Sequence, residues 1–234
     1  MTLDTAPEAR PDAATGAAAG PILVINPNCN EAVTAGLDLA LAPFRLPGGP
    51  AIECLTLADG PFGIESQRDS DAVILPLVRL VESRPDAGAV VIACYSDPGL
   101  AACRDATRAP VFGIQESGVL TALARADLFG VLAISDASVR RHRQTLRAMG
   151  VLDRLAGERG LNMTVAESAE GPATFAKLEA TGRLLAEEGA GAIVLGCAGM
   201  ARHRAPLEAA LGLPVIEPTQ AAVAMALGVL LAPR

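Results

Sequence analysis

The sequence has few of the residues that proteins use to bind nucleic acids. It contains no tryptophan, and aromatic residues make up only 3% of its 234 residues. Its formal net charge is −7 at pH 7. Stacking on bases requires aromatic side chains, and binding to phosphates requires clustered cations. We therefore expect no nucleic acid among the partners of this protein.

Signals for membranes, secretion and nucleotide cofactors are also missing. No uncharged apolar run reaches the roughly 18 residues that a membrane-spanning helix needs. Residues 1–20 are rich in alanine, proline and aspartate, and they lack the basic start and apolar centre of a signal peptide. Neither a GxGxxG motif nor a P-loop occurs. We expect a cytoplasmic protein that binds neither a membrane nor a cofactor, with a disordered extension over residues 1–20.

The five cysteines form no recognisable disulfide or metal motif. Their number is odd and no CxxC pair occurs, so free thiols in a reducing compartment are expected. The two histidines, His142 and His203, lie in arginine-rich stretches that are typical of solvated helix faces, and we expect no metal site. A hydrolase that pairs Cys197 with His203 remains an alternative, although no acid or oxyanion partner is indicated.

What the sequence does contain is a unit that occurs twice. The stretches AVVIACYSDPG (89–99) and AIVLGCAGM (192–200) are apolar runs that end in a cysteine followed by small, turn-forming residues. Each is followed by a second apolar run that begins with proline, and the cysteines, Cys94 and Cys197, precede that proline by 16 and 17 residues. The repeat predicts one structural unit used twice, with a thiol at the same corner of each copy.

Apolar runs and helical stretches alternate along the rest of the chain. Strands are predicted at 21–26, 51–57, 89–94, 110–114, 129–135, 162–165, 192–197 and 214–218. Helices are predicted at 30–42, 70–83, 97–106, 117–126, 172–188 and 219–231, with two more through His142 and Arg202. Such alternation, with apolar strands, indicates parallel sheets covered on both faces. We predict an α/β protein of two pseudo-symmetric lobes: 21–116, joined by the C-terminal helix 217–232, and 117–216.

Four of the predicted strands end in side chains that carry chemistry. These are Asn26, Cys94, Ser135 and Cys197. Ligands of parallel α/β sheets bind beyond the carboxyl ends of the strands. We therefore predict a site for a small-molecule substrate between the two lobes.

Two facing thiols suit the inversion of a carbon acid. One thiolate removes the proton beside a carbonyl group, and the opposite thiol returns a proton to the other face. A helix start follows each cysteine, so we expect the helix field to favour the thiolate and the N–H groups there to hold an enolate oxygen. Buried cysteines are also common in protein cores, and Cys29, Cys54 and Cys103 are assigned to packing.

Five motifs together resemble the aspartate/glutamate racemase superfamily, and within it the hydantoin racemase branch. They are INPN (25–28), GPFGIES (60–66), ACYSDPGL (93–100), LGCAGM (195–200) and PVIEP (214–218). They extend over nearly the whole chain after residue 20. The resemblance implies a cofactor-independent racemase that uses Cys94 and Cys197 as its two bases. It also implies a substrate cradle made of Asn26, Ser66 and the residues after each cysteine, which are Tyr95, Ser96, Ala198 and Gly199.

The chain departs from the free amino-acid racemases of this superfamily in the residues after the cysteines. Those enzymes tend to carry Asn-Thr after the first cysteine and Thr after the second, whereas this chain has Tyr95-Ser96 and Ala198-Gly199. The difference favours an uncharged ring, such as a 5-substituted hydantoin or allantoin, over aspartate or glutamate. Ser135 is expected to replace the threonines usual after its strand. An amino-acid racemase and a non-catalytic small-molecule binder remain alternatives, and we expect a homo-oligomer.

Overall fold

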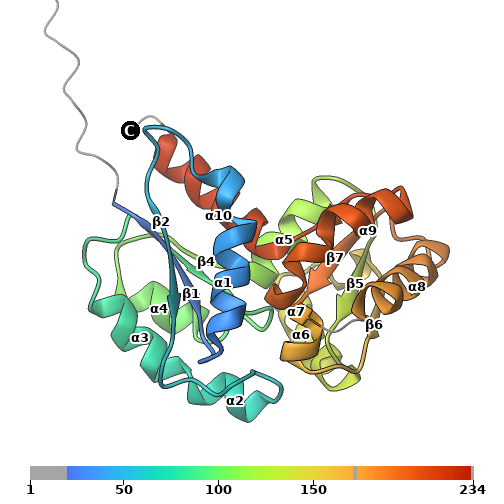
Figure 1. Ribbon diagram of the computed structural model, residues 1–234, viewed down its shortest axis with the longest axis horizontal. Helices are drawn as coiled ribbons and strands as arrows, with labels where there is room; N and C mark the ends of the chain where they lie inside the picture. Colours follow the sequence, from blue (N-terminus) through green and yellow to red (C-terminus); the bar gives the residue numbers. More distant parts are fainter. Residues whose placement is uncertain (1–19, 171–172, 233–234) are drawn as a thin grey trace, which may run out of the picture.

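The computed structural model, which describes residues 20–170 and 173–232, contains two four-stranded parallel sheets (Figure 1). The first sheet has the order β2 (Ile52–Thr56), β1 (Ile22–Asn26), β3 (Ala89–Ile92), β4 (Val111–Gly113). The second has the order β6 (Leu155–Gly160), β5 (Phe129–Ala133), β7 (Ala192–Gly196), β8 (Val215–Ile216). The two orders agree position by position, which confirms the α/β fold of two pseudo-symmetric lobes. The predicted extension, except for Gly20, lies outside the described residues.

Helices cover both sheets. In the first lobe they are α1 (Glu31–Ala40), η1 (Ala42–Phe44), α2 (Gln67–Ala72), α3 (Ile74–Glu82) and α4 (Leu100–Ala106). In the second lobe they are α6 (Asp136–Ala148), η2 (Leu152–Arg154), α7 (Val165–Glu170), α8 (Thr174–Glu187), η3 (Ala198–His203) and α9 (Arg204–Leu211). Within the described ranges, none of the helices has the length and apolar character that crossing a membrane would require.

The central strands of each sheet are the parts of the chain that the apolar runs predicted. Every residue of β1, β3, β5 and β7 is buried. A strand covered on both faces needs apolar side chains at successive positions, since both sides of the pleat face helices. Each fully buried Ile, Leu or Val contributes about 1.5–3 kcal/mol, so these four short strands anchor the two lobes.

Two helices cross between the lobes. Helix α5 (Ile114–Leu123) follows the last strand of the first sheet but packs against β7 of the second. Helix α10 (Pro218–Leu231) follows the last strand of the second sheet but packs against β3 of the first, and its Gln220 side chain donates a hydrogen bond to the Ala40 carbonyl at 2.9 Å. In Figure 1, α10 lies beside the first lobe and α5 between the two lobes. The two helices also pack against each other, so they join the lobes.

Helix α5 begins with a carboxylate supplied by another loop. Its N-cap residue is Gly113, which has no side chain to offer. The Asp97 carboxylate accepts hydrogen bonds from the backbone N–H groups of Gln115 and Glu116, both at 2.9 Å. A Cβ atom added to Gly113 would lie 2.3 Å from Asp97 Cγ. Glycine at the cap therefore leaves the space that the carboxylate of Asp97 fills.

Helix α10 is capped by the side chain of its own N-cap residue. Glu217 is the N-cap, and its carboxylate accepts from the backbone N–H groups of Thr219 at 3.1 Å and Gln220 at 2.6 Å. These are the second and third helical positions, as Gln115 and Glu116 are in α5. Both helices thus carry a buried acceptor for the N–H groups that a helix start leaves unpaired.

The structure corrects two of the predicted elements. The strand expected at 162–165 is wrong: β6 spans Leu155–Gly160, and residue 165 begins α7. Strand β6 is at the edge of its sheet and is only partly buried, so it needs no continuous apolar run. The helix expected to begin at Asp97 begins instead at Leu100, because Asp97 has a φ of 44° and directs its carboxylate to α5.

Candidate active site

A cavity lies where the carboxyl ends of the two sheets face each other. Both lobes contribute to its wall, which consists of Asn28, Val33, Ile64, Ala93, Cys94, Tyr95, Ser96, Ile134, Ser138, Arg141, His142, Val165, Gly196, Cys197, Ala198 and Gly199. The volume open to the centres of water-sized molecules is about 40 Å³, enough for a few waters.

The two cysteines occupy equivalent turns of the two lobes, and both line this cavity. The Cys94 carbonyl accepts from the N–H of Asp97 at 2.9 Å, and the Cys197 carbonyl accepts from the N–H of Met200 at 3.1 Å. Cys94 is partly exposed, whereas Cys197 is buried. The predicted repeat therefore produces the same backbone turn twice, with a thiol in each.

Glycine allows the second turn to form close to its neighbouring strand. Gly196 immediately precedes Cys197, and a Cβ atom there would lie 2.6 Å from the carbonyl oxygen of Leu132 on β5. No side chain fits at that distance. The glycine fixes how closely the cysteine turn approaches β5, and so where its thiol lies.

Desolvation raises the pKa of both thiols, although Cys94 keeps some exposed surface. The pKa of Cys94 is raised to about 12 by desolvation, which outweighs the opposing hydrogen bond from the Ser96 N–H; a negative charge on Cys197 raises it further. Desolvation also raises the pKa of Cys197, against its hydrogen bond with the Ser168 side chain and the one from the Gly199 N–H. Burial therefore outweighs the nearby N–H groups, which do favour the thiolate. The helix after Cys94 begins only at residue 100.

Six of the nine residues predicted for the site line the cavity. They are Cys94, Tyr95, Ser96, Cys197, Ala198 and Gly199. Asn26, Ser66 and Ser135 lie outside its lining. Ser66 and Ser135 cap helices α2 and α6, and Asn26 is fully buried, with its amide donating to the Asn28 side chain at 3.0 Å. Asn28 and Ser138, which those residues help to hold, are the ones in the cavity wall.

Comparison with known proteins decides the family. A family model described as Asp/Glu/Hydantoin racemase matches residues 22–226. The chain belongs to this family. It is similar to a hydantoin racemase of Paenarthrobacter aurescens, with 35% identity over 213 residues that cover 88% of this chain and 89% of that protein.

Solved structures agree with this assignment. An allantoin racemase from Klebsiella pneumoniae has a TM-score of 0.84 and 29% identity, and the match covers 90% of this chain and 87% of that one. A glutamate racemase from Bacillus anthracis, at 17% identity, shares the fold with a TM-score of 0.68 over 90% of this chain and 81% of that one. The two-lobed architecture of this racemase-family protein is therefore common to both relatives.

His142 lies at the cavity wall of this racemase homologue and is buried, which the sequence did not indicate. The Nδ1 atom of His142 is 2.6 Å from Oε1 of Glu158, and the two side chains are 3% and 0% exposed. The ring of Tyr95 meets the His142 ring edge-on at a centroid distance of 4.9 Å. The predicted solvated face is wrong here, because one side of α6 turns this histidine inward against a carboxylate on β6.

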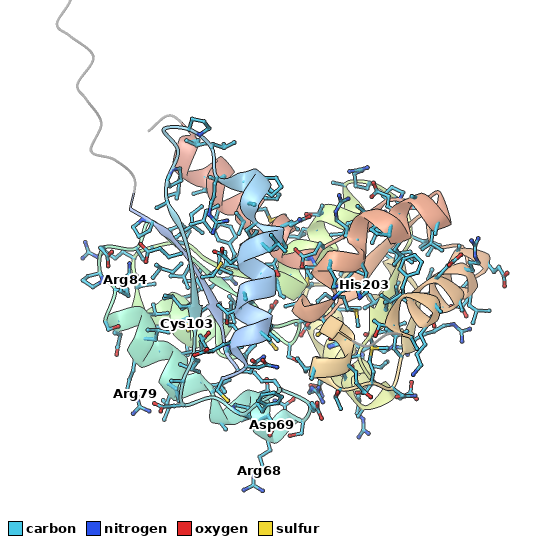
Figure 2. All side chains as sticks on the ribbon, viewed as in Figure 1. Arg68, Asp69, Arg79, Arg84, Cys103 and His203 are labelled. Carbon is cyan, nitrogen blue, oxygen red and sulfur yellow. The ribbon has the colours of Figure 1, made fainter. Side chains whose placement is uncertain are left out.

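His203 is also buried, contrary to the prediction. Figure 2 places it within the second lobe, whereas Cys103 lies in the first. Its ring packs against Phe175, its Nε2 is buried without a hydrogen-bond partner, and desolvation lowers its pKa. Within the part of the chain that the structure describes, no hydrogen bond joins His203 to Cys197, whose sulfur contacts Ser168 instead. The structure therefore does not show the pairing that a Cys–His hydrolase would need. Among the described residues no cluster of three or more His, Cys, Asp and Glu side chains could hold a metal ion.

One cationic side chain reaches the cavity. Arg141 follows Ser138 by one helical turn on α6, so both lie on the face that lines the cavity. The Nε of Arg141 is buried without a hydrogen-bond partner, and no ion pair of its guanidinium occurs within the described part of the chain. Its charge lowers the pKa of Asp69 on the opposite lobe only as the weakest of several causes. The sequence placed Arg141 on a solvated face and gave no sign of this role.

Proposed function

We propose that this protein is a cofactor-independent racemase of hydantoin-type rings, with Cys94 and Cys197 as its two bases. The observation that supports this most is that the two thiols line one cavity from equivalent turns of opposite lobes. An inversion needs a base on one face of the carbon and an acid on the other, and this arrangement provides both. Family membership at about a third identity to a hydantoin racemase supports the same reaction class.

The proposed reaction moves one proton in and one proton out at C5 of the ring. A thiolate at one cysteine takes the C5 proton, and the electron pair of that bond passes to the neighbouring carbonyl as an enolate. The thiol of the other cysteine then gives its proton to the opposite face of C5. The second cysteine ends as the thiolate, ready for the other enantiomer.

Backbone N–H groups beside the sulfurs are suited to hold the enolate oxygen. The N–H groups of Ser96 and Gly199 bond to the thiols. Those of Tyr95 and Ala198, which directly follow the cysteines, are therefore the donors that we assign to the oxygen. A ring amide, which offers both a carbonyl acceptor and an N–H donor, also matches the side chains of Asn28 and Ser138 in the wall.

Arg141 supports a second candidate substrate class. A guanidinium at the wall is suited to a carboxylate or to a polar ureido group. Aspartate, glutamate and allantoin each carry one of these groups, whereas a hydantoin with an alkyl substituent does not. We rank allantoin-like rings above alkyl hydantoins, and both above the acidic amino acids, because the cavity also has apolar walls from Val33, Ile64 and Val165.

Polarimetry on single enantiomers tests the proposal. The panel consists of D- and L-5-isopropylhydantoin, D- and L-5-benzylhydantoin, (S)-allantoin, L-aspartate and L-glutamate. We expect the optical rotation of one or more ring substrates to decay to zero and that of the amino acids to persist. The variant that carries both Cys94→Ser and Cys197→Ser should be inactive, whereas Cys54→Ser, a thiol on β2 outside the cavity wall, should be active.

Each other result points to a different function. Racemisation of aspartate or glutamate alone would support the amino-acid alternative. A ligand that binds, as measured by calorimetry, without exchanging its C5 proton in D₂O would support a non-catalytic binder. An active double cysteine variant would exclude the two-thiol mechanism.

A further inference from the structure

The hydrogen-bond partners of the two thiols differ at one position. In the first lobe, Cys94 receives both the backbone N–H and the hydroxyl of Ser96. The equivalent residue in the second lobe is Gly199, which also donates its N–H to the cysteine but has no hydroxyl. Within the repeated turn, Cys197 therefore lacks the hydroxyl partner that Cys94 has.

A serine from another element makes up this difference. Ser168 lies on α7, is completely buried, and places its Oγ 3.5 Å from the Sγ of Cys197. The same hydroxyl donates to the Val165 carbonyl at 2.7 Å. That second bond fixes the side chain, so its distance from the sulfur is set by the helix rather than by the cysteine turn.

Helix α7 is itself held on both sides. The Thr174 hydroxyl donates to the Glu167 carbonyl at 2.8 Å, and the helix packs against η3, which begins directly after Cys197. From the other lobe, Glu65 accepts a hydrogen bond from the N–H of Val165 at 3.4 Å. The position of Ser168 is therefore determined by contacts within the second lobe and by contacts from Glu65 and α1 of the first.

We propose that Ser168 is the positioning residue of Cys197 and does for it what Ser96 does for Cys94. The inference rests on the proposed two-thiol mechanism. A hydroxyl has one proton and two lone pairs, so it can serve both forms of the cysteine. With the thiol, the S–H donates to Ser168 Oγ while the O–H donates to Val165; with the thiolate, the O–H turns to the sulfur. No bond to carbon or sulfur is made or broken by Ser168 itself.

Reactivity of each cysteine towards iodoacetamide, read by mass spectrometry without substrate, tests the proposal. Ser168→Ala should slow alkylation of Cys197 at pH 8 about tenfold, as expected for loss of one hydrogen bond to a charged group, and change that of Cys94 less than about twofold. Ser96→Ala is the matched control and should do the reverse. Ser168→Thr keeps the hydroxyl and should keep the reactivity of Cys197.

The outcomes separate this inference from the function. Equal slowing of both cysteines by Ser168→Ala, or no slowing of Cys197, would overturn the role of Ser168 whatever reaction the protein catalyses. Alanine is a better helix former than serine, so α7 should survive the change; circular dichroism checks this. On a confirmed substrate, Ser168→Ala should lower kcat with little change in KM, and equally in both directions, because two enantiomers have an equilibrium constant of one.

Discussion

The two lobes are alike in backbone and unlike in side chains. Both have the same strand order and the same cysteine turn. The N-cap carboxylate of α5 comes from Asp97 in the cysteine turn, whereas that of α10 is Glu217 at the cap itself. The hydroxyl beside one thiol comes from its own turn and the other from α7. The proposed inversion of a carbon between the two lobes needs like geometry at the two sulfurs, whereas the surroundings, which would meet different substituents, are free to differ.

The largest expected effect is the loss of racemisation activity when the cysteine of either lobe is replaced. Cys94→Ser and Cys197→Ser should each lower racemisation by about 10³-fold or more, since each removes one of the two acid–base groups of the proposed mechanism. Each single variant keeps one base and should therefore exchange the C5 proton of only one enantiomer in D₂O. The two variants should act on different enantiomers, and NMR follows the exchange. One single variant with nearly normal racemisation would mean that only one lobe supplies a base.

The pH dependence of the wild-type protein tests the raised pKa of both thiols. The proposed mechanism needs one thiolate, and the pKa of Cys94 is raised to about 12. Below the pKa of both thiols, each unit of pH raises the thiolate fraction tenfold, so kcat/KM should rise about tenfold per unit from pH 6 to 9. Polarimetry measures this once the uncatalysed rate with the double serine variant is subtracted. A plateau near pH 7 would show that one thiol ionises readily in the free protein.

Gly113→Ala should lower the stability of the protein, because it disturbs the Asp97 cap of α5. The new methyl group would lie within 2.6 Å of the Asp97 carboxylate, displacing the acceptor of two helix N–H groups. We expect a loss of about 3 kcal/mol in the free energy of unfolding by urea. Gly36→Ala on α1, where nothing lies within 4 Å of the added atom, is the control and should be neutral or slightly stabilising. Equal stability of the two variants would contradict the assigned role of Asp97.

The smallest expected effect is a change in protein stability with pH, caused by the two buried carboxylates. Burial raises the pKa of Asp97 to about 7. Because this folded pKa is above that of the unfolded chain, its stabilisation is complete below about pH 4 and is lost as the pH rises through 7. Relative to Asp97→Asn, the wild type should therefore lose roughly 2–3 kcal/mol between pH 5 and 8. Urea unfolding at both values measures this; a constant difference would mean that Asp97 is already ionised at pH 5.

Glu217→Gln extends the same comparison to the second lobe. Burial raises the pKa of Glu217 as well, so the wild type should again lose stability relative to this variant as the pH rises. A change of opposite sign would indicate that Glu217 is stabilised as the carboxylate and that the two caps are not equivalent.

Local patterns were sufficient for the scaffold of this protein. Continuous apolar runs identified β1, β3, β5 and β7, because a strand covered on both faces cannot carry polar side chains inward. The repeat located Cys94 and Cys197 at equivalent corners, because the same sequence of strand, turn and proline folds the same way twice. The edge strand β6 escaped detection, since a half-exposed strand tolerates glycine and charge.

The chemical state of the site depended on contacts between distant parts of the chain. The side chain of His142 turns inward to pair with Glu158 on another element, and Ser168 reaches Cys197 because α7 packs beside η3. Burial of both thiols raises their pKa although the sequence suggested the reverse. Sequence determined the buried central strands, the repeat and the two thiols, which depend on neighbours along the chain. Tertiary structure alone decided solvation and hydrogen-bond partners, because these depend on what the fold brings close in space.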